Sequence, residues 1–154
     1  MPTYIPVNES YSNQSDLVNV INYVFNPCKV LSNSYGGLQV RLESIESIIK
    51  DFLFVKNIYG KTDGRQLRHF IISFDPEDNI SPQEALKIAY IASEYYSDYQ
   101  MVFTVHENKP NLHIHFVMNS VSYKTGKKYA GGEYDWYSFV KYCKQRIPEF
   151  QYKK

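Results

Sequence analysis

One short stretch of the chain, residues 105 to 119, holds three of the four histidines in the sequence. His113 and His115 flank a single apolar residue within an apolar run that predicts a β-strand. Alternate side chains of a strand point to the same side of a sheet, so these two imidazoles share one face. His106 ends the apolar run before them, and the polar link between the two runs suits a hairpin turn. The spacing therefore predicts that three imidazoles converge from two adjacent strands.

These three histidines are predicted to bind a divalent metal ion. Neutral imidazole is the commonest transition-metal ligand in proteins, and three protein ligands leave coordination positions open for a substrate. A packed structural role is the alternative for any single histidine, but the shared spacing favours ligation by His106, His113 and His115. Magnesium prefers oxygen ligands, whereas imidazole favours manganese or a later metal. Mg²⁺ and Mn²⁺ are the first candidates, and other transition metals stay open.

Charge restricts where a nucleic acid can bind. The formal net charge is only +1, so a binding surface for phosphates has to be a local patch. Lys124, Lys127 and Lys128 form one candidate patch, and Arg65 and Arg68 form another. An ordinary solvated turn is the alternative in both cases.

The length of 154 residues predicts a single domain, 1–154. The two cysteines lack the spacing of metal ligands, and lone thiols indicate a reducing compartment. No apolar run is long enough to cross a membrane, and the N-terminus lacks the pattern of a secretory leader. We therefore expect a cytoplasmic protein without a membrane partner.

The order of predicted elements gives an α+β fold, in which helices flank a central antiparallel sheet. Ser81 and Glu84 form a capping-box pattern at the start of one helix. The elements expected from apolar periodicity are a strand at 3–7, a helix at 15–24, a loop at 32–37, a helix at 44–56, a strand at 67–74, a helix at 81–96, strands at 101–106 and 112–119, an extension of the sheet within 121–129, and a helix at 133–145.

The histidine motif resembles that of a known family. His106-x-Asn108, followed by the His-x-His run at 113–119, is similar to the signature of relaxases, the mobilisation nucleases of the HUH endonuclease superfamily. That family usually has His-x-Asp in the upstream element, where this chain has Asn108. The resemblance covers about residues 15 to 130 and is most specific from 67 to 129. It implies an antiparallel sheet with the His-x-His strand at its centre.

The resemblance also implies a nucleophile. The stretch Tyr23 to Lys29, which contains Asn26 and Pro27, resembles the family's motif for a catalytic tyrosine N-terminal to the histidines. Tyr23 would then attack a phosphodiester of single-stranded DNA and form a 5′-phosphotyrosine bond, with the metal activating a phenol of pKa about 10. Simple packing of Tyr23 on its helix is the alternative. The other candidates on the same side of the histidines are Tyr4, Tyr11 and Tyr35.

The implied protein is a metal-dependent, site- and strand-specific endonuclease and transesterase that nicks a transfer origin. It would act in the mobilisation of a plasmid or conjugative element, together with accessory DNA-binding proteins of a relaxosome. Two polar residues have supporting roles in this scheme. His69 would orient Tyr23 or the phosphate, unless it is structural, and Asn108 would hydrogen-bond a ligand imidazole and fix its tautomer.

Three other functions fit the same residues less well. HUH transposases and replication initiators place the tyrosine after the histidines, where this chain has Tyr134, Tyr137 and Tyr142. A non-catalytic single-stranded DNA-binding domain would keep the fold and leave the metal site unused. A metal hydrolase of small molecules would need a general base, and Glu107 is the only obvious one.

Overall fold

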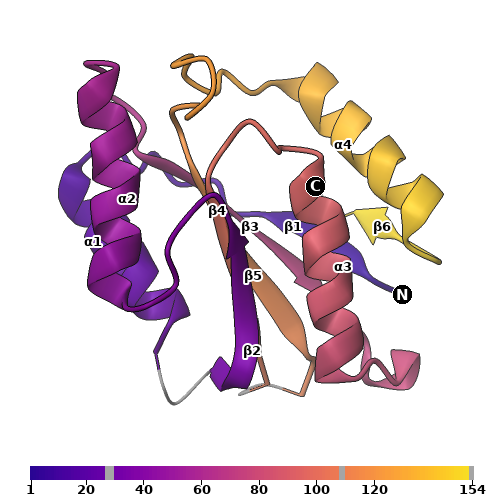
Figure 1. The fold of residues 1–154 in the computed structure, drawn as a ribbon. Coiled ribbons are helices and arrows are strands. Elements are labelled where there is room, and N and C mark those ends of the chain that lie inside the picture. Colours follow the sequence, from indigo (N-terminus) through magenta and orange to yellow (C-terminus); the bar gives the residue numbers. More distant parts are fainter. Residues whose placement is uncertain (27–29, 108–109, 153–154) are drawn as a thin grey trace.

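The structure, a computed structural model, describes residues 1–26, 30–107 and 110–152 of the chain. Its centre is a six-stranded sheet with the strand order β2-β4-β5-β3-β1-β6 (Figure 1). The strands are β1 (Thr3–Pro6), β2 (Val30–Leu38), β3 (Leu67–Ser73), β4 (Met101–His106), β5 (His113–Asn119) and β6 (Gln151–Tyr152). The short β6 pairs in parallel with β1, and the other neighbouring pairs are antiparallel. The predicted α+β fold with a central antiparallel sheet is confirmed, and β5 lies inside the sheet between β4 and β3.

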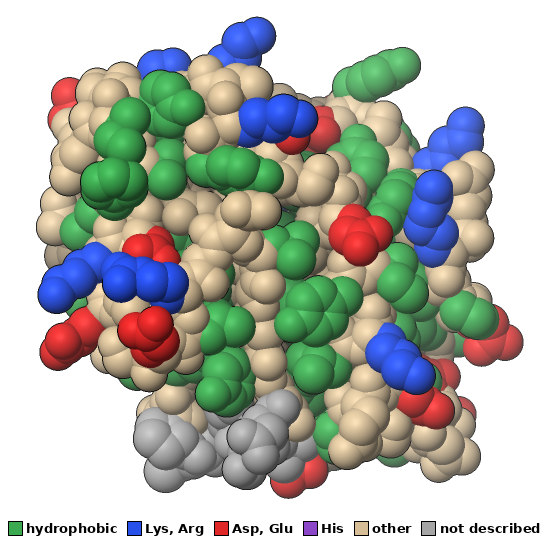
Figure 2. All heavy atoms as spheres, viewed as in Figure 1, with side chains coloured by type: hydrophobic (Ala, Val, Ile, Leu, Met, Phe, Trp, Pro, Cys, Tyr) green, Lys and Arg blue, Asp and Glu red, His purple; other side chains and the backbone are tan. Residues whose placement is uncertain are grey.

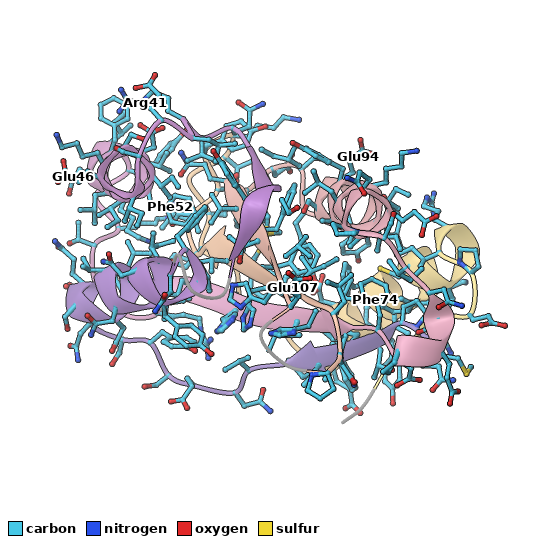
Figure 3. The ribbon with its side chains drawn as sticks, turned by 90° about the horizontal axis from the view of Figure 1, so that it is seen from below. Arg41, Glu46, Phe52, Phe74, Glu94 and Glu107 are labelled. Carbon is cyan, nitrogen blue, oxygen red and sulfur yellow. The ribbon has the colours of Figure 1, made fainter. Side chains whose placement is uncertain are left out.

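Helices cover both faces of this sheet. They are α1 (Gln14–Val24), α2 (Ile45–Ile58), the short 3₁₀ helix η1 (Pro76–Asp78), α3 (Pro82–Glu94) and α4 (Glu133–Arg146). Seen along the sheet in Figure 3, α1 and α2 lie to one side and α3 and α4 to the other. Phe52 of α2 belongs to the core on the first side, and Phe74, just after β3, belongs to the core on the second.

The alternation of the strands decides which core each side chain joins. Val117 of β5 packs in the core beneath α1 and α2, whereas Phe116 packs in the core beneath α3 and α4. His115 is two residues before Val117, and His113 is four before it, so both imidazoles lie on the side of α1. Thr104 and His106 of β4 have the same parity as Val102, which also joins the core beneath α1. The face that carries the histidines is therefore the face that α1 covers.

The predicted cap is present at the start of α3 but not at the start of α1. The hydroxyl of Ser81 accepts a hydrogen bond from the Glu84 amide at 3.1 Å, and the Glu84 carboxylate accepts one from the Ser81 amide at 3.1 Å. Pro82 occupies the first helical position, where its missing N–H costs nothing. Helix α1 begins earlier than predicted, with Asn13 as its N-cap. The predicted capping box of α3 is confirmed.

Two sheet predictions were wrong. Residues 32–37, predicted as a loop, lie within β2, where Gly36 pairs with Phe103 of β4. A Cβ atom on Gly36 would lie 2.6 Å from the Phe103 ring and 2.6 Å from the Tyr90 hydroxyl, so this glycine serves close packing beneath α3 and not a turn. Segment 121–129 makes only an isolated bridge between Val121 and Lys128 and does not extend the sheet as a strand.

Charged side chains are dispersed over the surface. On the face shown in Figure 2, Lys and Arg side chains lie among acidic and apolar ones and form no continuous basic area. This distribution agrees with the net charge of +1, so a site for anions has to be formed by a few local groups.

Candidate active site

Three imidazoles meet where β4 ends and β5 begins. The register pairs His106 with His113 directly, and it pairs Thr104 with His115. The three histidines each offer a ring nitrogen, and these nitrogens lie within 4.8 Å of one another. All three side chains are buried, with exposed fractions of 0% for His106, 7% for His113 and 4% for His115. The convergence predicted from the spacing is present.

Backbone carbonyls fix the tautomers of two of these rings. His106 Nε2 lies 2.7 Å from the Val24 carbonyl oxygen, and His113 Nδ1 lies 3.0 Å from the Asn111 carbonyl oxygen. A carbonyl can only accept, so the proton of each neutral ring is on the nitrogen that faces it. The lone pairs are then on Nδ1 of His106 and Nε2 of His113. Metal-binding histidines commonly donate their second nitrogen in this way.

The fourth histidine of the sequence, His69, lies outside the cluster and contacts His115. His69 Nε2 of β3 lies 2.8 Å from His115 Nδ1, and the Tyr11 hydroxyl lies 3.2 Å from His69 Nδ1. Burial, with a smaller contribution from His106, lowers the pKa of His69 to about 4, so its ring is neutral at physiological pH. If His115 offers Nε2 to a metal, its Nδ1–H donates to His69 Nε2, and His69 Nδ1–H donates to the hydroxyl of Tyr11. His115, His69 and Tyr11 then form one hydrogen-bonded chain.

Tyr23 lies against the cluster. It is on the last turn of α1, with 44% of its side chain exposed, and its ring centroid lies 5.7 Å from that of His115 and 6.5 Å from that of His106. The next residue, Val24, accepts the hydrogen bond of His106 through its carbonyl. The end of α1 is thereby tied to the three-histidine cluster, and the tyrosine beside it is accessible from solvent.

The alternative tyrosines are placed differently. Tyr4 is fully buried, and Tyr11 contacts His69 instead of reaching the cluster itself. Tyr35 packs its ring edge against Phe25 at 5.8 Å. The three tyrosines of the C-terminal helix, Tyr134, Tyr137 and Tyr142, belong to α4, which covers the opposite face of the sheet (Figure 1).

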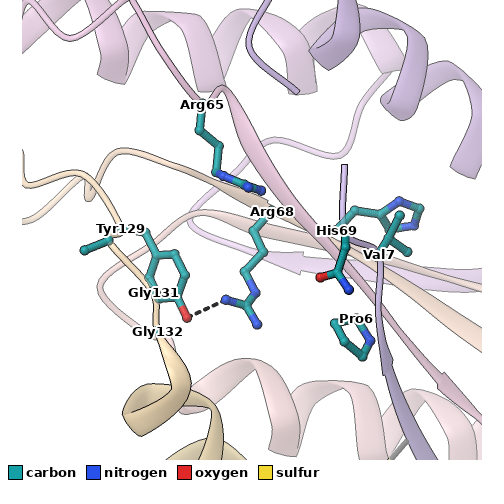
Figure 4. A pocket seen from close by; sticks show the side chains of 10 residues that line it. Pro6, Val7, Arg65, Arg68, His69, Tyr129, Gly131 and Gly132 are labelled. Atoms are coloured by element: carbon teal, nitrogen blue, oxygen red, sulfur yellow. Dashed lines mark hydrogen bonds between the residues drawn. The ribbon is translucent and has the colours of Figure 1, made fainter. Parts of the chain in front are cut away.

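The other predicted residues fall into three groups. Asn108 lies outside the described residues, as do Pro27 and Lys29 of the tyrosine motif. Lys124, Lys127 and Lys128 follow the far end of β5 from the histidines; Lys124 pairs with Asp98 at 3.6 Å, and the amino group of Lys128 donates to the Asp63 carbonyl. Arg65 and Arg68, in contrast, line a cavity that reaches His69 (Figure 4).

Sequence reasoning missed two features of this site. It placed His69 near Tyr23 or the phosphate, whereas the structure places it on His115, and it considered Tyr11 only as a nucleophile. The Tyr11–His69 contact joins residues 58 apart in sequence, so no local spacing indicates it. The positive φ of 44° at Tyr11, a conformation rare for tyrosine, is equally invisible in the sequence.

A buried set of three imidazoles with an accessible tyrosine against it is a site suited to metal-assisted phosphodiester chemistry. Comparison with known families agrees with this class. The chain belongs to the relaxase family of MobA/VirD2-like nuclease domains, whose model matches residues 23–151. The predicted relationship to relaxases is therefore confirmed.

Individual relatives share a third or less of their aligned residues with this chain. Protein rlx of Staphylococcus aureus is 32% identical over 99 residues, which are 64% of this chain and 30% of that protein. The group II intron-interrupted relaxase LtrB of Lactococcus lactis subsp. cremoris is 24% identical over 156 residues, which cover 84% of this chain and 26% of that protein. The chain thus spans about a third or less of the length of these relatives.

One solved structure shares the fold. A chain of the structure described as "Molecular Basis of Vancomycin Resistance Transfer in Staphylococcus aureus" superposes with a TM-score of 0.59 at 10% identity. The match covers 94% of this chain and 89% of that chain. Within the described residues, no helix combines the length and the apolar character needed to cross a membrane.

Proposed function

We propose that residues 1–154 act as the nuclease domain of a relaxase, which nicks one strand of DNA at a transfer origin during mobilisation of a plasmid or conjugative element. The observation that carries the proposal is the position of Tyr23, whose ring lies 5.7 Å from that of His115 at the edge of the three-histidine cluster. The substrate is single-stranded DNA, and accessory proteins of a relaxosome are the expected partners. The proposal implies action in the cytoplasm, where such DNA is found.

The donor set fits a divalent transition metal. His106, His113 and His115 would hold the ion through three neutral imidazole nitrogens, whose tautomers are compatible with ligation. Imidazole ligands favour Mn²⁺ or a later metal over Mg²⁺, which prefers oxygen. When bound, the ion supplies positive charge that stabilises the phosphate oxygens in the transition state.

The chain's own residues carry the transfer step. The Tyr23 phenol loses its proton, and its oxygen forms a bond to phosphorus as the bond from phosphorus to the 3′ oxygen breaks. The 3′ oxygen takes up a proton, and the 5′ phosphate remains esterified to Tyr23. Because a phenolate is also a good leaving group, a second 3′-hydroxyl can reverse the step and rejoin the strand. His106 holds the end of α1 through Val24 and so positions the tyrosine.

The test uses single-stranded oligonucleotides tiled across the DNA around the protein's own gene. Each tile is incubated with the protein and Mn²⁺ or Mg²⁺ and then run on a denaturing gel. We expect one tile to yield a covalent adduct that requires metal, disappears with EDTA and is absent with Tyr23→Phe. Tyr137→Phe, which changes an equally exposed tyrosine on α4, is the matched control and should leave the adduct unchanged.

Other results would replace the proposal. An adduct that survives Tyr23→Phe and is lost with Tyr137→Phe would identify the C-terminal tyrosine of a transposase or replication initiator. Metal-independent binding of a tile without an adduct, from folded and metal-loaded protein, would identify a DNA-binding domain.

A further inference from the structure

A second candidate site lies beyond His69. We call it the arginine pocket, a cavity of about 180 Å³ between the end of β1, the start of β3 and the start of α4 (Figure 4). Its lining includes Pro6, Asn8, Arg65, Arg68, His69 and Gly131. A wider hollow continues from it past Arg68 to Trp136. The His69 ring joins the two sites, because it lines the pocket and also contacts His115 of the histidine cluster.

The Arg68 guanidinium is held in place by two tyrosines. Its Nη1 donates to the Tyr129 hydroxyl at 2.6 Å, and its Nη2 donates to the Tyr4 hydroxyl at 2.7 Å. The guanidinium also lies over the Tyr129 ring, 4.9 Å from the centroid. Tyr4 is fully buried against Phe139, so this support is part of the core. A guanidinium has five N–H donors, and these tyrosines use two of them.

Both arginines are without a carboxylate partner in the described part of the chain, where the ion pairs involve other residues. Asp135 is linked to Arg68 only through the Tyr129 hydroxyl, which accepts from Arg68 and donates to Asp135. Glu133 lines the adjoining hollow but forms no ion pair with Arg68. Arg65 is exposed and extends toward the same pocket in Figure 4. Two cations with unused donors therefore face one small cavity, which suits an anion with several oxygens.

We propose that the arginine pocket binds a backbone phosphate of single-stranded DNA, distinct from the phosphate that Tyr23 attacks. The pocket is too small for a folded partner, and the planar forks of two arginines match phosphate oxygens. The strand then runs from the histidine cluster across His69 to Arg68, with the attached nucleoside toward Trp136. This assignment rests on the proposed function for the identity of the strand.

The test compares wild-type protein with Arg65→Gln and Arg68→Gln in EDTA, where binding is measured without nicking. Fluorescence anisotropy of the tiled oligonucleotides is recorded between about 50 and 200 mM NaCl. Each variant should bind about tenfold more weakly, and the slope of log K against log salt should become shallower by about 0.7. Arg146→Gln, an exposed arginine on the last turn of α4, has the same charge change and should match wild type.

A second experiment locates the phosphate. Single methylphosphonate linkages, which are neutral, are placed in turn along the best-binding tile. One linkage other than the nicked one should weaken binding by wild-type protein about tenfold. The same linkage should have a clearly smaller effect on Arg68→Gln, since one of the two arginines that contact this phosphate is already gone. If Arg68→Gln does not fold, Arg65→Gln serves in its place, because Arg65 is exposed.

The outcomes separate the two proposals. If Tyr23 forms an adduct but no methylphosphonate linkage has an effect that depends on Arg65 or Arg68, the proposal for the arginine pocket is overturned and the proposed nuclease function stands. If one linkage has an effect on binding that depends on these arginines but no adduct forms, the pocket is supported and nicking is rejected. Equal salt slopes for wild type and both variants would overturn the pocket.

Discussion

At the scale of single residues, the site depends on which nitrogen of each ring carries its proton. Tyr11→Phe removes the acceptor for His69 Nδ1 and frees His69 to rotate or change tautomer. His115 would then lose its fixed partner at Nδ1. We expect about tenfold weaker Mn²⁺ binding, because partners of this kind contribute 10–100-fold to metal affinity. Isothermal titration calorimetry with Mn²⁺ measures the change.

The matched control for this prediction is Tyr59→Phe, which removes a hydroxyl that donates to the Tyr123 carbonyl in a different part of the fold. It should leave Mn²⁺ affinity unchanged. Equal affinities for wild type and Tyr11→Phe would show that the hydrogen bond to Tyr11 plays no part in orienting His115.

Some residues of the site could be predicted from the sequence and others could not. The three clustered histidines were predictable because a strand repeats every two residues and a short polar link returns the chain. Tyr23 was found through a motif and not through geometry. The support of His115 by His69 and of Arg68 by Tyr4 and Tyr129 joins residues far apart in sequence, and such contacts exist only once the sheet order is known.

At the scale of elements, Gly36 allows β2 to pack closely against α3. Gly36→Ala would place a methyl group 2.6 Å from the Phe103 ring and from the Tyr90 hydroxyl, so β2 or α3 would have to shift. Overpacking of this kind costs about 1–3 kcal/mol of unfolding free energy. Urea denaturation measures it, and Gly36→Ala combined with Tyr90→Phe should recover part of the loss. An unchanged midpoint for Gly36→Ala would mean that the strand is packed more loosely.

Helices α2 and α3 were predicted well because their caps and apolar spacing are local signals. Strand β2 was not, because Ser, Asn and Gly residues are typical of turns. Its pairing with β4 satisfies backbone groups and brings Gly36 under Tyr90. That advantage depends on partners 50 or more residues away and outweighs local preference.

At the scale of the whole molecule, one buried cation connects a helix to the central sheet. Lys56 of α2 is 1% exposed, and its amino group donates to the Gln66 carbonyl, the Asn119 side-chain oxygen and the Ser120 hydroxyl. It links α2 to the residue before β3 and to the end of β5, without any carboxylate among these partners. Burial, with a smaller contribution from Lys128, lowers the pKa of Lys56 to about 7.

This depressed pKa makes stability depend on pH in a definite direction. Between the folded pKa of about 7 and the ordinary value of 10.5, the unfolded chain holds a proton on Lys56 that the folded chain lacks. Unfolding then takes up a proton, so the free energy of unfolding rises with pH, by at most about 1.4 kcal/mol per unit. Below pH 7 both states are protonated, and Lys56 adds no slope.

Denaturant melts at intervals from pH 6 to about 9, below the ordinary pKa of tyrosine, measure this slope. We expect stability of the wild type relative to Lys56→Met to increase across that range, because titrations common to both proteins cancel in the difference. Lys50→Met removes an exposed lysine from the same helix and should retain the wild-type slope. Parallel curves for wild type and Lys56→Met would instead mean that three acceptors hold the ammonium form at every pH tested, and that Lys56 links α2 to the sheet as a permanent charge.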